Sequence, residues 1–180
     1  MPPLKRAFYE RPTVTVARDL LGQVIILGGA TARIVETEAY LGAGDAAAHS
    51  YSGITRRTQV IFGEPGHAYV YLIYGMHYCL NVVAEAKDIA GCVLIRAVEP
   101  VGSVLGATNG PGKLTRALGI TLAHNGCDLT KGPLKIHAGL QIPEDEIVTS
   151  CRIGITKSAD LPLRFFVKGN RFVSRGRLNP

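Results

Sequence analysis

The chain has 180 residues and a mass of 19.2 kDa, the size of one compact domain that can bury a core without disulfides or a metal. Hydrophobic residues make up 47% and charged residues 19%, with a mean hydropathy of +0.17 and a net charge of +6, which excludes a disordered chain. No apolar run approaches the ~18 residues of a membrane span, and no signal-peptide core follows Met1. We therefore expect a soluble cytoplasmic protein.

The first elements are predicted from turn residues and apolar periodicity. A helix is expected over residues 12–22, with proline in its first turn and glycine at its end. Strands over 23–27 and 31–41 flank two glycines and predict a hairpin. The stretch 43–66 has no sustained period and predicts a long functional loop.

The later elements are mostly strands. Three β-prone runs are expected to be neighbouring central strands, at residues 67–73, 76–83 and 91–98. A turn and short helix with a glycine stop are expected over 109–119, followed by late strands at 152–155 and 163–168. This order favours one α+β domain over residues 1–180, built on a curved, largely antiparallel β-sheet that resembles an open barrel, with a few flanking helices.

The net charge is concentrated in one part of the chain. Residues 1–100 hold nine basic and nine acidic side chains, whereas residues 101–180 hold eleven and five. The basic run that follows Asp160 without an intervening carboxylate consists of Arg164, Lys168, Arg171, Arg175 and Arg177. Such a run suits a polyanion such as nucleic acid, because Lys and Arg release counterions from phosphates, but a solvated basic tail is an equal alternative.

The cysteines and histidines show no metal-ligand spacing. The four cysteines, Cys79, Cys92, Cys127 and Cys151, form no C-x-x-C pair, so we expect buried free thiols in a reducing compartment. The five histidines form no cluster with each other or with cysteine. We expect no metal.

Two carboxylates and a tyrosine alternate along one predicted strand. Glu36, Glu38 and Tyr40 share one face of it, while Val35, Thr37, Ala39 and Leu41 can pack inward from the other. A carboxylate beside an aromatic ring in a cleft can act as a general base over a planar substrate. The alternative is a solvent-exposed polar face.

Tyrosines also recur on the next predicted strand. Tyr69 and Tyr71 share one face, and Tyr74 lies just beyond, before Gly75, at an expected tight bend. Tyrosines beside basic residues suit stacking on bases, although half-buried strand aromatics are the commoner case.

A glycine-rich turn precedes the second predicted helix. The segment 109–114 fails the Walker pattern, because Ala107 and Leu114 stand at two of its required positions, so an ATPase is disfavoured. Backbone amides at the helix start and Lys113 could hold one phosphate of a polymer, or the segment could be a plain turn. No nucleophile elbow is present, which leaves carboxylate-activated water as the leading chemistry.

Five ordered blocks of residues resemble a known family. They are residues 33–42 (RIVETEAYLG), 47–50 (AAHS), 69–76 (YVYLIYGM) with Asn81, 92–100 (CVLIRAVEP) and 110–114 (GPGKL). In order and spacing, from about Phe8 to Ser174, they resemble the alkyladenine (3-methyladenine, methylpurine) DNA glycosylases.

The resemblance implies a monofunctional base-excision repair enzyme. Such an enzyme flips a damaged purine out of duplex DNA and hydrolyses its N-glycosidic bond, leaving an abasic site without strand cleavage. By this match Glu38 activates the attacking water and stabilises oxocarbenium character, while Glu36 has a structural role. The implied substrates are alkylated or deaminated purines of the 3-methyladenine, 7-methylguanine, hypoxanthine and ethenoadenine class.

The resemblance also implies roles for other residues. Tyr40, His49 and Tyr71 would line the pocket of the flipped base, and Asn81 would disfavour the 2-amino group of normal guanine. Tyr74 would intercalate into the gap left in the duplex. The residues implied to contact DNA or the flipped nucleotide are Arg57, Arg96, Lys113, Lys168 and Arg171. No metal or organic cofactor is implied, and the partner would be double-stranded DNA containing damaged purines, bound by a monomer with access to a bacterial-type nucleoid.

Two other classes of function stay open on the residues alone. One is a non-catalytic nucleic-acid-binding module, and the other is a hydrolase or transferase acting on a free nucleotide. The basic excess favours a polymer over a free nucleotide, and the five-block resemblance opposes both.

Overall fold

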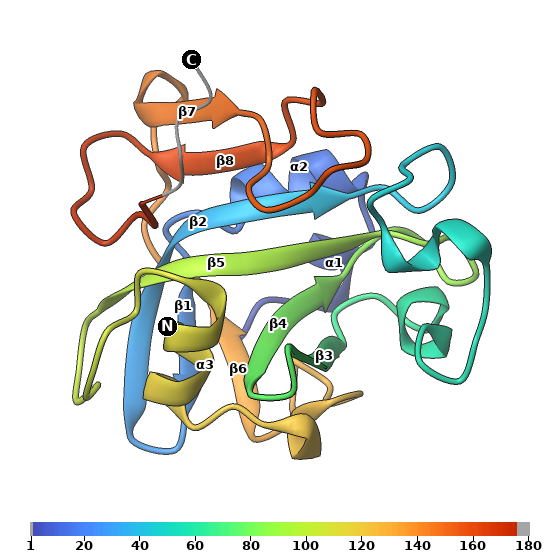
Figure 1. Ribbon diagram of the computed structural model, residues 1–180. Coiled ribbons are helices and arrows are strands. Elements are labelled where there is room, and N and C mark those ends of the chain that lie inside the picture. The colour runs from blue at the N-terminus through green and yellow to red at the C-terminus, as the bar shows by residue number, and fades with distance from the viewer. Residues whose placement is uncertain (1, 176–180) are drawn as a thin grey trace.

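A single curled β-sheet organises the computed structural model, which describes residues 2–175 (Figure 1). The eight strands are β1 (Val24–Leu27), β2 (Ala30–Tyr40), β3 (Ala68–Ile73), β4 (His77–Val83), β5 (Cys92–Pro100), β6 (Leu134–His137), β7 (Ile147–Ser150) and β8 (Arg164–Val167). Their pairings within the described residues are all antiparallel. The predicted α+β class with a curved antiparallel sheet is confirmed.

Strand β2 lies at the centre of this sheet. The strand order is β3-β4-β5-β2-β1-β6, and β8 pairs with β2 beyond β1 and carries β7 on its outer edge. One edge of β2 pairs with β5, while the other pairs first with β1 and then with β8. The register against β5 shifts around Glu36, and such irregularities bend a strand and re-aim its side chains. The two predicted carboxylates therefore lie where β2 has neighbours on both sides.

Short helices cover the sheet. They are the α-helices α1 (Arg6–Tyr9), α2 (Thr13–Asp19) and α3 (Pro111–Leu118) and the 3₁₀ helices η1 (His49–Ser52), η2 (Gln59–Phe62), η3 (Leu122–His124) and η4 (Glu144–Glu146). α1 and α2 lie behind the sheet in the view of Figure 1, and α2 is joined to β2 by a 2.8 Å hydrogen bond from Thr37 Oγ1 to the carbonyl of Ala17. α3 packs on β4 and β5 and ends at Gly119, whose φ of 72° favours glycine.

The main core joins the sheet to α2 and α3. Leu20, Ile34, Ile95, Leu114 and Phe165 are buried in one apolar cluster although they come from five different elements or turns. Burying each such side chain contributes roughly 1.5–3 kcal/mol. This core fixes β2 and β5, the two strands that carry the acidic and basic residues of the site.

Most local predictions agree with the structure. The hairpin pairs β1 with β2, the expected first helix occupies Thr13–Asp19, and the long loop 43–66 contains only the short 3₁₀ helices η1 and η2. The three middle strands are neighbours, but β3 lies at the edge of the sheet rather than in its centre.

The late strand expected at residues 152–155 is wrong. The strand that precedes β8 is β7, at Ile147–Ser150. In the segment that follows, the amide of Ile153 donates to the carboxylate of Glu38 instead of to a neighbouring strand, and the Arg152 side chain is buried. The amide of Ile153 is thus bonded to a side chain from a distant segment, which a strand pattern cannot reveal.

Two further predictions about side-chain exposure need correction. Cys79 and Cys92 are buried free thiols as expected, but Cys127 is half-buried and Cys151 is exposed, because its neighbour Arg152 takes the inward position. Arg164, counted in the basic run, is buried and donates to Glu36, so it does not offer its charge to a polyanion. None of the helices between residues 2 and 175 is long and apolar enough to cross a membrane.

Candidate active site

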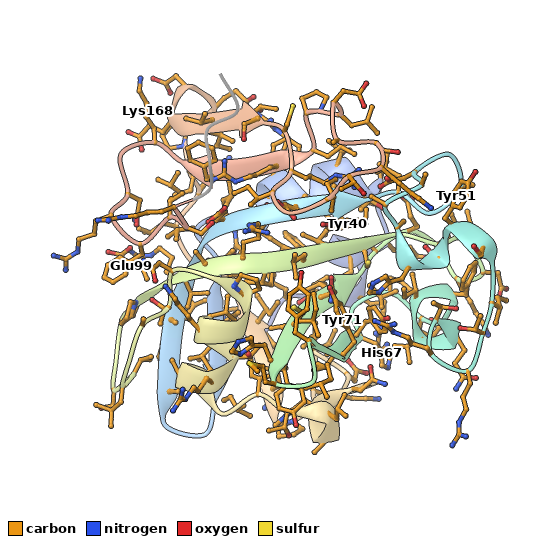
Figure 2. All side chains as sticks on the ribbon, viewed as in Figure 1. Tyr40, Tyr51, His67, Tyr71, Glu99 and Lys168 are labelled. Atoms are coloured by element: carbon orange, nitrogen blue, oxygen red, sulfur yellow. The ribbon has the colours of Figure 1, made fainter. Side chains whose placement is uncertain are left out.

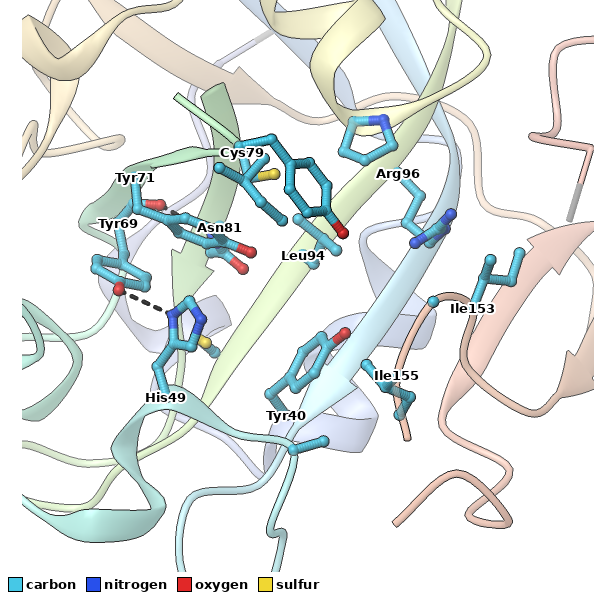
Figure 3. A pocket seen from close by; sticks show the side chains of 16 residues that line it. Tyr40, His49, Tyr69, Tyr71, Cys79, Asn81, Leu94, Arg96, Ile153 and Ile155 are labelled. Atoms are coloured by element: carbon cyan, nitrogen blue, oxygen red, sulfur yellow. Dashed lines mark hydrogen bonds between the residues drawn. The ribbon is translucent and has the colours of Figure 1, made fainter. Parts of the chain in front are cut away.

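A pocket of about 370 Å³ opens beside β2, β3, β4 and β5 (Figure 3). Its lining consists of Tyr40, Ala47, His49, Tyr69, Tyr71, Ile73, Tyr74, Cys79, Asn81, Cys92, Leu94, Arg96, Pro111, Ile153, Gly154 and Ile155. Its volume and its mixture of aromatic and polar groups suit a small planar ligand. Six residues that the sequence predicted for the site line this pocket, although they span 56 positions of the chain. They are Tyr40, His49, Tyr71, Tyr74, Asn81 and Arg96.

Aromatic rings form the walls of the pocket. The His49 ring lies edge-on to Tyr71 with centroids 4.6 Å apart, and Tyr71 lies beside Tyr69 at 5.5 Å. Figure 3 shows His49 and Tyr71 on one side of the space and Tyr40 and Ile155 on the other. A flat group between Tyr40 and Tyr71 could contact a ring face on each side.

His49 is held as a neutral imidazole. Its Nδ1 lies 3.0 Å from the hydroxyl of Tyr69, the dashed contact of Figure 3. Burial of the ring against its neighbours and the positive charge of Arg57 lower the pKa of His49 to about 4, although part of the residue is exposed to the pocket. At neutral pH His49 can therefore offer hydrogen bonds but is a poor source of a proton.

Glu36 and Glu38 are both fully buried, with 0% of their surface exposed. The sequence predicted that these carboxylates face either a cleft or solvent. Both predictions are wrong for the two glutamates, because neither has any exposed surface. Arg164 and Ser174 donate to Glu36 and the amide of Ile153 donates to Glu38, and only Tyr40 of the three lines the pocket. The inward packing of Val35, Thr37 and Ala39 is confirmed.

Glu38 lies immediately beneath the pocket surface. Its Oε2 accepts a 2.9 Å hydrogen bond from the hydroxyl of Tyr40, and its Oε1 accepts one of 2.7 Å from the amide of Ile153. Arg96 Nη1 lies 3.3 Å from the same Oε1. All three partners line the pocket, so the carboxylate is one side chain away from anything bound there.

The environment of Glu38 acts on its pKa in two directions. Burial raises the pKa above the ordinary value of a glutamate, and the positive charge of Arg96 and the hydrogen bonds from Ile153 and Tyr40 oppose this without cancelling it. Burial beside Glu38 also raises the pKa of Tyr40, so its hydroxyl stays protonated and donates. A carboxylate with a raised pKa binds a proton more strongly than an exposed one, which suits a general base.

Arg96 joins the two glutamates. Its Nε donates to Glu36 Oε1 over 3.1 Å, while Nη1 pairs with Glu38. Glu36 also accepts from Arg164 Nε at 2.7 Å and from the amide and hydroxyl of Ser174. Burial lowers the pKa of Arg96, but the two glutamates more than offset this, so Arg96 stays charged. Two carboxylates can therefore be buried together because two guanidinium groups share them.

Tyr74 stands at the tip of the turn between β3 and β4. It is 82% exposed and its φ is 53°, a left-handed conformation that is costly for a bulky residue. Gly75 follows with a φ of 68°. The turn thus holds an aromatic ring out at the mouth of the pocket, while Asn81 lies buried inside it and donates to the carbonyl of Tyr69.

The other predicted DNA contacts lie outside the pocket. Arg57 is exposed and places its guanidinium 5.1 Å from the centroid of the Tyr71 ring. Lys113 is exposed at the start of α3, two positions after Pro111 of the lining, and donates to Asn109.

Lys168 and Arg171 are exposed beyond β8, and Figure 2 shows Lys168 well away from Tyr40 and Tyr71. Arg175 is exposed, and Arg177 falls outside the described residues.

Several residues of the site were not found from the sequence. Ile153 and its neighbours line the pocket and touch Glu38, although they are more than 100 positions away in the chain. Asp45 and Arg152 form a buried pair behind Tyr40. A lone Asp in a loop and a lone Arg before an apolar residue carry no periodic signal that would single them out.

No group of three or more histidine, cysteine, aspartate or glutamate side chains within residues 2–175 is placed to hold a metal ion.

Comparison with known proteins assigns the chain to a family. Residues 7–171 match the family model described as methylpurine-DNA glycosylase. A protein of Methanoculleus marisnigri is 51% identical, with 96% of this chain and 98% of the relative covered, and one of Rhodopseudomonas palustris is 49% identical, with 96% and 90% covered. A third, from Alkaliphilus oremlandii, is 45% identical, with 96% and 98% covered, and all three bear the name "Putative 3-methyladenine DNA glycosylase". The match spans every element of the pocket, and the chain belongs to the methylpurine-DNA glycosylase family.

Proposed function

We propose that this protein is a monofunctional DNA glycosylase that removes alkylated or deaminated purines from duplex DNA. The damaged nucleotide is flipped into the pocket, and water activated by Glu38 attacks the sugar and releases the base. The product is an abasic site in an uncut strand. The proposed substrates are 3-methyladenine, 7-methylguanine, hypoxanthine and ethenoadenine.

The observation that carries this proposal is the contact between Tyr40 and Glu38. One residue supplies both a ring at the pocket wall and the hydroxyl that holds the buried carboxylate. A base stacked on Tyr40 would therefore place its sugar close to Glu38. This is the arrangement that glycosidic hydrolysis needs, because the base leaves from the same carbon that water attacks.

The hydrogen bonds and the raised pKa of Glu38 support a role as general base. A carboxylate has about four acceptor positions; Tyr40 and Ile153 fill one on each oxygen, and Arg96 forms an ion pair with Oε1. Oε2 keeps a free acceptor position, and we propose that in the DNA complex a water molecule reaches it beside Tyr40 and gives up its proton there. The raised pKa makes Glu38 a stronger base than an exposed glutamate, and its negative charge stabilises the positive charge that develops on the sugar.

The aromatic walls support selection of electron-poor bases. A cationic alkylated purine gains ~0.5–2 kcal/mol from an aromatic face beyond its burial. Asn81, buried in the pocket, is proposed to oppose the 2-amino group of normal guanine. Tyr74 is proposed to fill the gap that the flipped nucleotide leaves, since its ring is already exposed at the pocket mouth.

Excision from a defined duplex tests the proposal. The substrate is an oligonucleotide duplex with one hypoxanthine or ethenoadenine, and abasic sites are detected by alkaline cleavage. We expect wild-type protein to produce abasic sites without nicking, and Glu38→Gln to lose ~10²- to 10⁴-fold in rate while it still binds the duplex. Glu99→Gln is the matched control, because Glu99 forms a partly exposed pair with Arg33, does not line the pocket and lies away from Tyr40 and Tyr71 in Figure 2.

The outcomes separate the alternatives. Unimpaired release by Glu38→Gln rejects Glu38 as the base. Binding of the duplex without release by wild-type protein supports a non-catalytic nucleic-acid-binding module instead. Hydrolysis of free nucleotides but not of the duplex would favour an enzyme of nucleotide metabolism.

A further inference from the structure

A buried ion pair lies behind the Tyr40 wall and does not itself line the pocket. Arg152 donates from Nη1 to Asp45 Oδ2 over 2.6 Å and from Nη2 to Asp45 Oδ1 over 2.8 Å. The two side chains are 0% and 1% exposed, respectively. Burial alone would raise the pKa of Asp45, but the hydrogen bonds from Arg152 and from backbone amides lower it, so the pair stays charged.

The pair joins two segments that are distant in sequence. Asp45 also accepts from the amides of Leu41 and Ala47, which shapes the turn that leaves β2. Arg152 also donates to the carbonyls of Ala39, at 2.9 Å, and Ser158, at 3.2 Å. Both joined segments supply pocket lining, with Ala47 from the first and residues 153–155 from the second.

Arg152 is linked to Glu38 through Tyr40 and through Ile153. Its guanidinium carbon lies 4.6 Å from the centroid of the Tyr40 ring, whose hydroxyl holds Glu38. The next residue, Ile153, donates its amide to the other oxygen of Glu38 at 2.7 Å. The orientation of the stacking ring and the position of the carboxylate therefore both depend on one guanidinium group.

We propose that Asp45 and Arg152 are positioning residues for base excision, which hold the Tyr40 ring and the Ile153 amide at the geometry that Glu38 requires. This inference rests on the proposed function. Replacing a buried ion pair by apolar residues is often neutral for stability, so the presence of this pair is weak evidence for a purely stabilising role. The planar, bidentate guanidinium provides one, since it fixes an angle as well as a distance, which a lysine ammonium does not.

The test compares Arg152→Lys and Asp45→Asn with Arg6→Lys and Asp128→Asn. Arg6 and Asp128 form another partly buried pair, at 2.6 Å, which anchors the N-terminal segment and has no residue in the pocket lining. Each protein is assayed for single-turnover release of hypoxanthine at a temperature where circular dichroism shows it to be folded. The maximal rate, the half-saturating enzyme concentration and the acid limb of the pH profile are measured.

We expect the two pocket-side variants to lose ~10- to 100-fold in maximal rate, the size of effect produced by a misplacement of about 1 Å. The acid limb of their pH profiles should move to higher pH. The Ile153 hydrogen bond lowers the pKa of Glu38, so a weaker bond lets that pKa rise further. The half-saturating concentration should change little, and the Arg6 and Asp128 variants should keep wild-type rates even where their melting temperature falls.

Three results would overturn parts of this account, and they are distinct. Wild-type protein that releases no base contradicts the proposed function itself. Wild-type rates and an unshifted acid limb in Arg152→Lys and Asp45→Asn contradict the positioning role. A rate loss in all four variants that follows melting temperature alone assigns the pair to stability only and also contradicts it.

Discussion

Tyr40 donates its phenolic hydrogen to Oε2 of Glu38 over 2.9 Å, and this bond connects the pocket wall to the buried carboxylate. The two residues are two positions apart on β2 and their side chains leave the same face of the strand. The contact couples the stacking surface to the proposed chemistry, because any tilt of the ring moves the donor that opposes the raised pKa of Glu38.

Tyr40→Phe should separate stacking from this coupling. The ring remains, but the hydroxyl whose hydrogen bond lowers the pKa of Glu38 is removed. The acid limb of the excision pH profile should therefore move to higher pH. The excision rate at pH values above that limb should change less. Single-turnover rates across pH measure this. Tyr51→Phe is the control, since Tyr51 is an exposed tyrosine outside the pocket lining, and an identical profile for Tyr40→Phe and wild type would contradict the coupling.

Arg96→Met should destabilise the fold. The side chain of Arg96 is 10% exposed and shared by two fully buried carboxylates, so its removal leaves buried charge uncompensated and should cost about 3–5 kcal/mol. Arg33 pairs with Glu99 on the same sheet, and the two side chains are 28% and 30% exposed. Arg33→Met breaks this pair and should lower the free energy of unfolding by only about 0–1 kcal/mol. Urea unfolding at pH 7 compares the two, and equal losses would show that the glutamates do not depend on Arg96.

Glu38→Gln should not weaken the fold at neutral pH. The pKa of Glu38 is raised in the folded protein, so its ionised form opposes folding, and stability falls as the pH rises from the unfolded pKa through the folded one. Glutamine keeps acceptor capacity and carries no charge to bury. The melting temperature at pH 8 should equal or exceed that of wild type, and a clear decrease would indicate that the charge of Glu38 is needed to hold Arg96.

The imidazole of His49 should titrate with a midpoint of about 4 in a ¹⁵N NMR experiment. The histidine pKa in the unfolded chain is about 6.5, so the unfolded state takes up this proton first and stability should fall as the pH decreases from about 6.5 towards 4. Arg57→Met removes a nearby positive charge and should raise the midpoint. A midpoint near 6.5 in wild-type protein would mean that His49 can be charged at neutral pH.

Salt dependence tests the basic residues outside the pocket. Replacing Lys168 and Arg171 with alanine should reduce the slope of log affinity against log salt by about one for each DNA phosphate that is no longer neutralised. Lys113→Ala provides the comparison, because Lys113 lies near the pocket at the start of α3. A slope that changes for Lys113→Ala but not for the double variant would place Lys168 and Arg171 away from the DNA.

Local sequence signals were sufficient for most of the framework. The paired glycines at 28 and 29 and the alternation on either side predict the β1–β2 hairpin, and Gly119 ends α3 where its left-handed φ requires a residue without a side chain. The shared face of Glu36, Glu38 and Tyr40 also follows from the period of a strand. These features depend on neighbours within a few residues, so the sequence contains the information directly.

The burial of that face could not be predicted in the same way. Spacing tells which side chains point together, but not that the amide of Ile153 meets Glu38 or that Arg96 and Arg164 neutralise the glutamates. The segment 152–155 has the apolar pattern of a strand, and yet the amide of Ile153 donates to a carboxylate that lies 115 positions earlier in the chain. A strand pattern fails there because the decisive partner is a side chain from another part of the fold.

The sequence by itself determined the antiparallel framework, the placement of two carboxylates and a tyrosine on one strand face, and the family, since five ordered motifs between residues 33 and 114 match it. Only the tertiary structure decided that Glu38 is buried with a raised pKa, that the basic run is divided between buried and exposed arginines, and that Asp45 and Arg152 support Tyr40 from behind. The reason is physical: the charge state of a carboxyl group depends on its solvent and on the charges within a few ångströms, and folding brings those charges from distant parts of the chain.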